Sequence, residues 1–261
     1  MRKYYFSAIS LFLLIFISSC ASKKNMYYFQ GDEAALKAVE KYTPALKPDD
    51  LLVITVSALD LNATLPFNQV NPYNVNTYTA ESLTSSNPRL VTYLIDENGN
   101  IDFPVLGKIK LAGLTRSQAT DMMQKKLSQY IKDPTVNINL VNFRITVLGE
   151  VTRPGTYTIS HEKITLPEAL GMAGDLTIYG MRKDVVVIRE IEGQKTFYHV
   201  DLTSNQSVFD SPVYYLDQND IVYVSPNGAR RNASQYGPST SMIVSITSLL
   251  ITILSIMSRN W

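Results

Sequence analysis

The last part of the chain, residues 242–257, most constrains its fold, because it is an uncharged run of Ile, Leu, Val, Met, Ser and Thr. As a helix it would be about 24 Å long at ~1.5 Å per residue, which is short for an average bilayer but closer to the thinner bacterial outer membrane. Arg259 and Trp261 follow, and such residues are typical of the membrane interface. The segment therefore predicts a C-terminal transmembrane or amphipathic helix.

Five hydroxyl side chains in and next to this segment recur at helical spacing and fall on one narrow stripe, at Ser241, Ser245, Ser248, Thr252 and Ser255. Hydroxyls inside a membrane need partners, so the stripe should face other helices or water rather than lipid. Three interpretations stay open. The stripe is a packing seam of small residues, the lining of an aqueous pore in a ring of identical helices, or an unused face of a simple tail anchor.

The other end of the chain has the parts of a secretory signal peptide, predicted over residues 1–19. Arg2 and Lys3 precede an apolar stretch that is too short to span a bilayer. Cys20 follows two serines, an arrangement that resembles the bacterial lipoprotein cleavage box, in which the cysteine becomes the first mature residue and carries lipid. Ala21 comes next, where lipoproteins retained in the inner membrane can have aspartate, so we expect attachment to the outer membrane with the body in the periplasm. The alternative is an uncleaved signal anchor with a free cysteine.

Composition excludes several classes of function. A net charge of +1 over 261 residues offers no basic surface for nucleic acid. Cys20 is the single cysteine, and the two histidines, His161 and His199, belong to no recognisable catalytic motif. Adjacent carboxylates such as Asp49 and Asp50 do not face each other across a cleft, as glycosidases require. We therefore predict no enzymatic activity, no metal site and no cofactor.

Between the ends, residues 20–42 are expected to form an extended leader, and residues 43–142 to form an α+β unit. Its predicted elements are a strand after the Lys47–Asp50 turn, a long loop over residues 60–88, a hairpin of residues 90–95 and 101–106 around Asn98-Gly99, a helix with a capping box at Thr115 and Gln118, and a strand over residues 135–141.

A second unit is predicted over residues 143–227, with a linker over residues 228–241 before the membrane helix. Its expected elements are a strand over residues 144–149, a type II turn at Pro154-Gly155, a capping box at Thr165 and Glu168 with a short helix closed by Gly171 and Gly174, and strands over residues 184–189 and 196–200. The segment 216–224 echoes residues 46–54: a leucine, a polar turn, an aspartate and then β-forming residues.

In order, these blocks resemble the bacterial capsular polysaccharide and exopolysaccharide export proteins of the outer membrane. The resemblance is carried by Leu46–Val56, Asp96–Gly107, Ala112–Thr115, Asp133–Val136, Val147–Tyr157, Thr165–Leu170 and Asp220–Val224. It implies a polysaccharide export domain over residues 43–142 followed by one soluble-ligand-binding β-grasp domain. One position departs from the family pattern: Asp49 stands where these proteins frequently have glycine, which puts a residue other than glycine where the turn needs a positive φ.

The resemblance also implies a ring-shaped homo-oligomer, often of eight subunits in the best-known member, whose C-terminal helices form a barrel through the outer membrane. Such rings work with an inner-membrane polysaccharide copolymerase, often coupled to a tyrosine kinase. The longest members carry more than one β-grasp unit, so a shorter periplasmic body is expected here. We therefore expect a channel subunit that exports polysaccharide; the alternatives are an enzyme that modifies surface polysaccharide, and a sugar-binding or scaffold lipoprotein without a pore.

Overall fold

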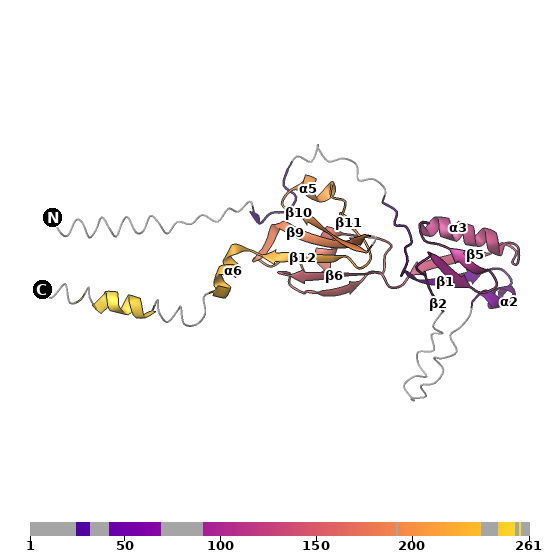
Figure 1. Cartoon of the computed structure of the whole chain (residues 1–261), viewed down its shortest axis with the longest axis horizontal. Helices are drawn as coiled ribbons and strands as arrows, with labels where there is room; N and C mark the ends of the chain where they lie inside the picture. The colour runs from indigo at the N-terminus through magenta and orange to yellow at the C-terminus, as the bar shows by residue number, and fades with distance from the viewer. Residues whose placement is uncertain are drawn as a thin grey trace, which may run out of the picture.

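The computed structural model describes residues 25–31, 42–68, 91–191, 193–235, 245–253 and 256. Two folded units lie end to end along the long axis of the molecule (Figure 1). The first unit contains the described residues between 42 and 142, and the second contains those between 143 and 227. Each has its own buried hydrophobic cluster, and Leu140 packs against both clusters. This mixed arrangement of helices and sheets confirms the predicted α+β class.

The first unit is built on a three-stranded antiparallel sheet in which the strand after the first turn is central. Alternate residues of that strand, Leu52, Ile54 and Val56, are buried, as expected for a sheet with one face on the core. The elements are β1 (Leu51–Ser57), α2 (Leu61–Thr64), η3 (Leu65–Phe67), β2 (Thr92–Leu94), β3 (Asn100–Phe103), β4 (Gly107–Lys110), α3 (Arg116–Leu127) and β5 (Thr135–Leu140). The sheet order is β2-β1-β5, and α3 packs against β5.

The predicted hairpin around Asn98-Gly99 is wrong in its pairing, although the turn itself is present. Gly99 has φ +83°, and the Asp96 carboxylate accepts a hydrogen bond from the Asn100 N–H at 2.8 Å. The ladder bonds go elsewhere: β2 pairs with β1, and β3 pairs with β4. Tyr93 of β2 is buried opposite Leu52, so β2 completes the free edge of β1 instead of extending β3.

The second unit is a five-stranded sheet with short helices over one face. Its elements are β6 (Arg144–Gly149), β7 (Gly155–Thr158), β8 (Ile164–Thr165), α4 (Leu166–Met172), β9 (Gly180–Ile191), β10 (Gln194–Val200), α5 (Asn205–Phe209), β11 (Tyr215–Leu216) and β12 (Ile221–Pro226). The sheet order is β10-β9-β12-β6-β7; only the β12–β6 pair is parallel. Buried residues of α4 and α5, including Leu166, Leu170 and Val208, belong to the same core as the inward side chains of the sheet.

Both predicted capping boxes are confirmed. At the start of α3, the Thr115 hydroxyl accepts the Gln118 N–H at 3.3 Å, and the Gln118 side chain accepts the Thr115 N–H at 2.9 Å. At the start of α4, Thr165 and Glu168 make the equivalent pair of bonds at 3.3 and 2.8 Å. Each box satisfies N–H groups that the first helical turn leaves without partners.

The predicted type II turn at Pro154-Gly155 is wrong. Gly155 lacks the positive φ that this turn requires, and it starts β7 instead. The reversal is tighter and comes earlier, at Gly149, which has φ +91° and whose carbonyl accepts the Val151 N–H at 2.9 Å. A Cβ at Gly149 would lie 2.0 Å from the Val224 carbonyl oxygen, so this crossing needs a glycine.

The chain leaves the second unit through a helix. The segment predicted as a linker begins with α6 (Gly228–Gln235), whose first turn is capped by the Asn227 side chain accepting the Arg230 N–H at 3.0 Å. Residues 245–253 are also helical. Within the described part of the chain, no helix has the length and apolar character needed to cross a membrane.

Candidate functional site

Two turns of the same design lie where the first and second units meet. In Lys47–Asp50, the Asp50 carboxylate accepts the Lys47 N–H at 2.9 Å; in Asp217–Asp220, the Asp220 carboxylate accepts the Asp217 N–H at 2.8 Å. Each turn also has the bond of its fourth N–H to its first carbonyl, at 3.2 Å in both. The echo between residues 46–54 and 216–224 is therefore a repeated turn structure.

The third position of each turn has a left-handed backbone. Asp49 has φ +68° and Asn219 has φ +64°. Asp and Asn tolerate this region better than other residues that have a Cβ. Asp49 therefore keeps the positive φ at the position where related proteins frequently have glycine.

The two turns contact each other through their first residues. The Lys47 Nζ lies 2.6 Å from Asp217 Oδ2, and the Tyr42 hydroxyl donates to Asp217 Oδ1 at 2.7 Å. The Tyr42 ring is stacked on Tyr215, with centroids 4.6 Å apart and planes 8° from parallel. Although burial alone raises the pKa of Asp217, the hydrogen bonds from Lys47 and Tyr42 and the charge of Arg189 lower it. The segment before β1 is thus fixed to the loop before β12 by a charged and an aromatic contact.

Arg189 of β9 binds the turn Asp217–Asp220. Its Nη2 lies 2.6 Å from Asp220 Oδ2 and donates to the Tyr215 carbonyl at 2.9 Å. The side chain of Asp220 is almost fully buried, so its charge depends on this guanidinium. The Arg189–Asp220 ion pair therefore holds the turn Asp217–Asp220 where Asp217 can bind Lys47.

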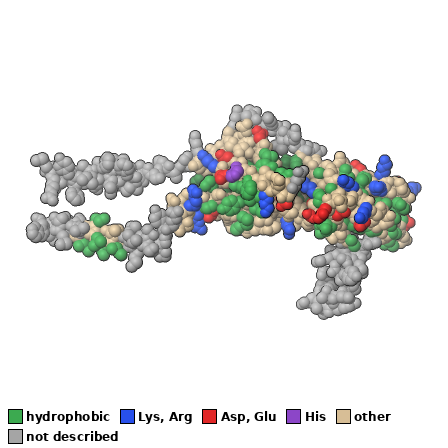
Figure 2. All heavy atoms as spheres, in the orientation of Figure 1, with side chains coloured by type: hydrophobic (Ala, Val, Ile, Leu, Met, Phe, Trp, Pro, Cys, Tyr) green, Lys and Arg blue, Asp and Glu red, His purple; other side chains and the backbone are tan. Residues whose placement is uncertain are grey.

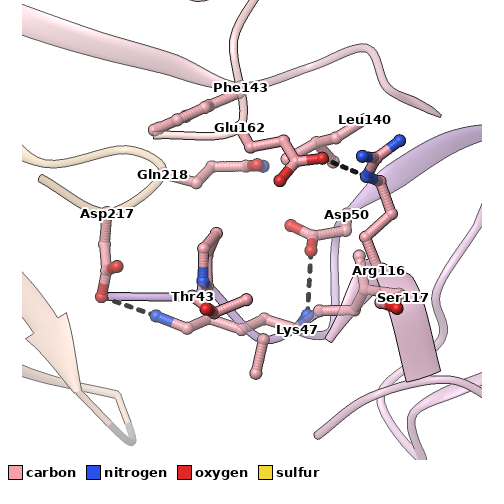
Figure 3. A pocket seen from close by; sticks show the side chains of 13 residues that line it. Thr43, Lys47, Asp50, Arg116, Ser117, Leu140, Phe143, Glu162, Asp217 and Gln218 are labelled. Atoms are coloured by element: carbon pink, nitrogen blue, oxygen red, sulfur yellow. Dashed lines mark hydrogen bonds and ion pairs between the residues drawn. The ribbon is translucent and has the colours of Figure 1, made fainter. Parts of the chain in front are cut away.

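A pocket of about 140 Å³ lies between the units, beside these turns (Figure 3). Arg116 at the start of α3 is ion-paired with Glu162 of the second unit across it. Asp50 and Gln218 line the pocket from the two turns. Burial raises the pKa of Asp50 to about 6. Gln218 Oε1 is buried without a hydrogen-bond partner among the described residues, so the pocket offers acceptors to a ligand or water that donates hydrogen bonds.

The ionised groups of this pocket are engaged with one another, which limits its chemistry. Asp217 is bound by Lys47, and Glu162 by Arg116. The described residues contain no group of three or more His, Cys, Asp or Glu side chains placed to hold a metal ion. The ion pairs of the pocket fix the two units to each other and leave a small polar recess between them.

Part of the leader, residues 25–31, docks on the second unit; we call it the leader strap. The Phe29 N–H donates to the Leu202 carbonyl at 3.0 Å, the Gln30 N–H to the Thr203 carbonyl at 2.7 Å, and the Asn205 N–H to the Gln30 carbonyl at 3.1 Å. Gly31 has φ +137°, and a Cβ there would lie 2.5 Å from Asn205 Oδ1. Nothing in the sequence pattern indicated this docking, because the strap has neither helical nor strand periodicity.

Tyr28 is the polar anchor of the leader strap. Its hydroxyl donates to Asp175 Oδ1 at 2.5 Å, and its ring lies 5.2 Å from the guanidinium carbon of Arg182. Burial, followed by the bond to Asp175, raises the pKa of Tyr28, so the hydroxyl stays protonated and remains a donor. Arg182 is itself buried and has no salt bridge among the described residues, so the Tyr28 ring supplies a favourable surface for its charge.

The structure describes only part of the predicted membrane sites. Cys20, Ser241, Ser255, Arg259 and Trp261 lie outside the described residues. Ser245, Ser248 and Thr252 lie on the helix of residues 245–253. There the Ser248 hydroxyl donates to the Ser245 carbonyl at 2.9 Å, and the Thr252 hydroxyl to the Ser248 carbonyl at 2.8 Å. Two hydroxyls of the predicted stripe are therefore satisfied within the helix itself.

The apolar side chains of that helix are not covered by any other described part of the chain. Its large side chains are about half exposed or more, at Ile246 (47%), Leu249 (61%), Leu250 (52%), Ile251 (68%) and Ile253 (45%), and Ile256 beyond the helix is 58% exposed. An exposed apolar surface of this kind is typical of a segment that contacts lipid or another protein.

Comparisons with known proteins agree with the order of the two units. Residues 38–141 match the family of polysaccharide biosynthesis/export proteins, and residues 144–224 match the SLBB domain. The EPS I polysaccharide export outer membrane protein EpsA of Ralstonia solanacearum is 34% identical over 143 residues, which is 53% of this chain and 37% of that protein. The EpsA protein of Ralstonia nicotianae is 35% identical over 92 residues, 34% of this chain and 24% of the relative.

The chain thus spans well under two thirds of the curated relatives it matches. The matches confirm the resemblance seen in the sequence blocks. They are named for export and for a binding domain rather than for catalysis, in agreement with the prediction that the chain is not an enzyme.

Proposed function

Because the chain belongs to the polysaccharide export family, we propose that it is a subunit of an oligomeric outer-membrane channel that carries capsular or extracellular polysaccharide from the periplasm to the cell surface. The observation that carries this proposal is that the leader strap and α6, the segments next to the proposed lipid anchor and membrane helix, leave the second unit at one place. The leader strap and α6 lie together at the end of the second unit that points away from the first (Figure 1).

Contacts to one loop account for this shared position. Tyr28 of the strap binds Asp175 and covers Arg182. On the same loop, Asn227 donates its side-chain amide to the Ile178 carbonyl at 3.2 Å, and the guanidinium of Arg230 in α6 lies 5.5 Å from the centre of the Tyr179 ring. A lipid anchor before the strap and a membrane helix after α6 would therefore reach the same bilayer.

The lipid would also set the distance of the second unit from the membrane. Cys20 lies five positions before Asn25, where the strap begins. Five extended residues span at most about 18 Å. In this arrangement a lipidated Cys20 places the second unit next to the outer membrane, with the first unit deeper in the periplasm. The first unit is then the part that faces an inner-membrane copolymerase or its tyrosine kinase.

The helix of residues 245–253 supports membrane insertion as an assembly. Its exposed Ile and Leu side chains suit lipid, and its internally bonded hydroxyls reduce the cost of placing a polar stripe in an apolar environment. The stripe then serves as a packing seam between copies or as the wall of an aqueous pore. Two attachments, one lipid and one helix, also give the stable anchoring that one lipid chain does not.

Imaging of the detergent-extracted full-length protein by cryo-electron microscopy tests this proposal. We expect ring-shaped particles in which the C-terminal helices of all copies surround a common axis. Export of the cognate polysaccharide by cells lacking the gene should be restored by the unmodified chain. Monomeric particles together with unimpaired export in the gene deletion would contradict the channel.

The runner-up is a scaffold or sugar-binding lipoprotein without a pore, for which the helix is a simple anchor. Replacing both Ser248 and Thr252 with leucine separates the two. A pore or a helix seam should lose most export, because bulky side chains enter the shared surface. An anchor should tolerate the change, with the same amount of protein in the outer membrane.

A further inference from the structure

The face of the second unit's sheet that points away from its core is apolar in the middle. Strand pairing sets two neighbouring rows across it, Phe197–Ile188–Ile221 and Val186–Tyr223–Leu148, which we call the outer patch. Phe197 is 58% exposed, Leu148 41% and Tyr223 38%. A sheet face that meets water usually carries polar residues, so this patch is built to be covered.

Charged residues border the outer patch at both ends of the strands. Beyond the first row, Lys195 lies opposite Glu190 in the strand register. At the end of the second row, His199 lies opposite Val186, and its Nδ1 is 2.6 Å from Asp184 Oδ1. Figure 2 shows hydrophobic side chains gathered over β9, β12 and β6, with basic side chains beside them. An apolar centre with a charged border is the arrangement found at protein–protein interfaces.

Other occupants fit the outer patch less well. Lipid would bring the bordering charges into hydrocarbon, which is costly. Polysaccharide is rich in hydroxyl groups, and the Val and Ile side chains at the centre of the patch offer it no hydrogen-bond partners. A protein surface with its own apolar side chains meets both conditions.

The leader strap offers such a surface on the opposite side of the core. It lies over the layer of α4 and α5, and Met26 (52%), Tyr27 (61%) and Phe29 (41%) point outward from it. Phe29 also touches Phe209 of α5, with ring centroids 5.7 Å apart, and the exposed Asp210 follows directly. The second unit therefore has an apolar patch with Lys195 at its border on one side, and an apolar patch with Asp210 beside it on the other.

We propose that the outer patch of one subunit receives the exposed side of the leader strap of the neighbouring copy. This inference rests on the proposed function, and it names the surface through which the copies meet. Two different patches on opposite sides produce a head-to-tail contact, which can repeat around a closed ring. Lys195 and Asp210 have opposite charges and would attract each other across this contact.

Cysteine cross-linking of the detergent-extracted full-length protein tests the contact directly. The chain has a single native cysteine, Cys20, so the unmodified protein reports the background. We expect the double variant Phe197→Cys/Tyr27→Cys to give a ladder of disulfide-linked multimers on mild oxidation. Phe197→Cys/Leu59→Cys is the matched control, because Leu59 is 96% exposed on the first unit. Dimers formed by Phe197→Cys alone, with no ladder in the double variant, would show patch-to-patch contact and overturn the proposal.

Charge insertion gives an independent measurement. Phe197→Asp and, separately, Leu148→Asp should reduce the fraction of chains in the oligomer at least about tenfold at a fixed protein concentration, as expected for central interface positions. Leu59→Asp should leave it unchanged. Circular dichroism melts identify any variant that has lost its fold, and two positions on different strands guard against this.

The outcomes also separate the interface from the proposed function. A ring of unchanged mass in both patch variants overturns the interface and leaves the channel standing. A ring of unchanged mass that no longer retains the cognate polysaccharide would assign the outer patch to the polymer instead. If the unmodified chain is monomeric, both the interface and the oligomeric channel are overturned.

Discussion

Lys47 and Asp217 hold the same position in two equivalent turns, one from each unit, and their side chains meet at 2.6 Å. The pair is asymmetric, because about half of the Lys47 side chain is exposed while Asp217 is largely covered and also accepts a bond from Tyr42. Loss of the Asp217 carboxylate should therefore destabilise the protein more than loss of the Lys47 side chain.

Substitution of these two residues should have unequal effects. Lys47→Ala is expected to lower the free energy of unfolding by less than about 1 kcal/mol, because the ion pair is partly screened by solvent. Asp217→Asn should lower it by about 1–3 kcal/mol, since Lys47, Tyr42 and Arg189 all lose a charged partner. Urea unfolding of the two single variants and the double variant measures the coupling. Additive losses would show that the pair contributes nothing of its own.

Asp50 should make stability fall as the pH rises. Its pKa is raised from the ordinary 3.8 to about 6, so the folded protein holds this proton more tightly than the unfolded chain does. The stability that it contributes is complete below about pH 4 and is lost as the pH rises through about 6. Asp50→Asn keeps an acceptor for the Lys47 N–H and removes the titration.

We therefore expect Asp50→Asn to be more stable than the unmodified chain at pH 7.5, by on the order of 1–3 kcal/mol, and about equally stable at pH 4. Unfolding midpoints at several pH values give the difference between the two proteins. Asp217 is the internal comparison, because its pKa is lowered and its contribution is lost on acidification instead. A difference between variant and parent that does not change with pH would contradict the prediction.

Gly31→Ala should release the leader strap. The added Cβ would lie 2.5 Å from Asn205 Oδ1, and the backbone φ of +137° disfavours any residue with a Cβ. The steric clash and the backbone conformation therefore both oppose docking of the strap in the variant. We expect faster hydrogen exchange at the Phe29 and Gln30 amides, by about tenfold or more if the strap loses ~1.4 kcal/mol or more. Gly171→Ala is the control, since a Cβ there meets nothing within 4 Å. Unchanged exchange at both amides would show that the strap does not need this glycine.

Cys20→Ala should abolish lipid attachment. The expected product is a chain that keeps its signal peptide or is released from the outer membrane, because the acceptor thiol is gone. Intact-mass measurement and membrane fractionation of the variant and its parent provide the test. A mature mass identical to that of the parent apart from the substitution, with full membrane retention, would remove Cys20 as the anchor. Ser19→Ala is the control, since a small residue remains before the cysteine.

Local features of the fold were predictable from the sequence, whereas long-range ones were not. Thr115 and Thr165 define capping boxes because the partner residue lies three positions away, so the signal is contained in a few residues. The partner of β2 depends on which strand edge is free, and the Asn98-Gly99 turn carries no information about that. Likewise, Pro154-Gly155 suggests a turn locally, but the sharp reversal occurs at Gly149, where β12 passes too close for a side chain.

In the sequence, only the similarity between residues 46–54 and 216–224 indicated the site at the unit boundary. Leucine, a polar turn and an aspartate recur at Leu46 and Leu216, and this signal indicated two similar turns. It contained nothing to show that the turns would touch, or that Arg189 would approach from β9. The boundaries of the segments, the lipid on Cys20 and the role of the hydroxyl stripe stay predictions.

The bond between Tyr28 and Asp175 joins residues that are 147 positions apart, with the whole first unit between them. During synthesis the strap therefore has no binding surface until the second unit has emerged. The first unit can fold while the leader is still unbound, and the strap binds the second unit last. Nascent chains truncated before Asp175 should thus leave the leader open to processing enzymes, and completion of the second unit should end that period.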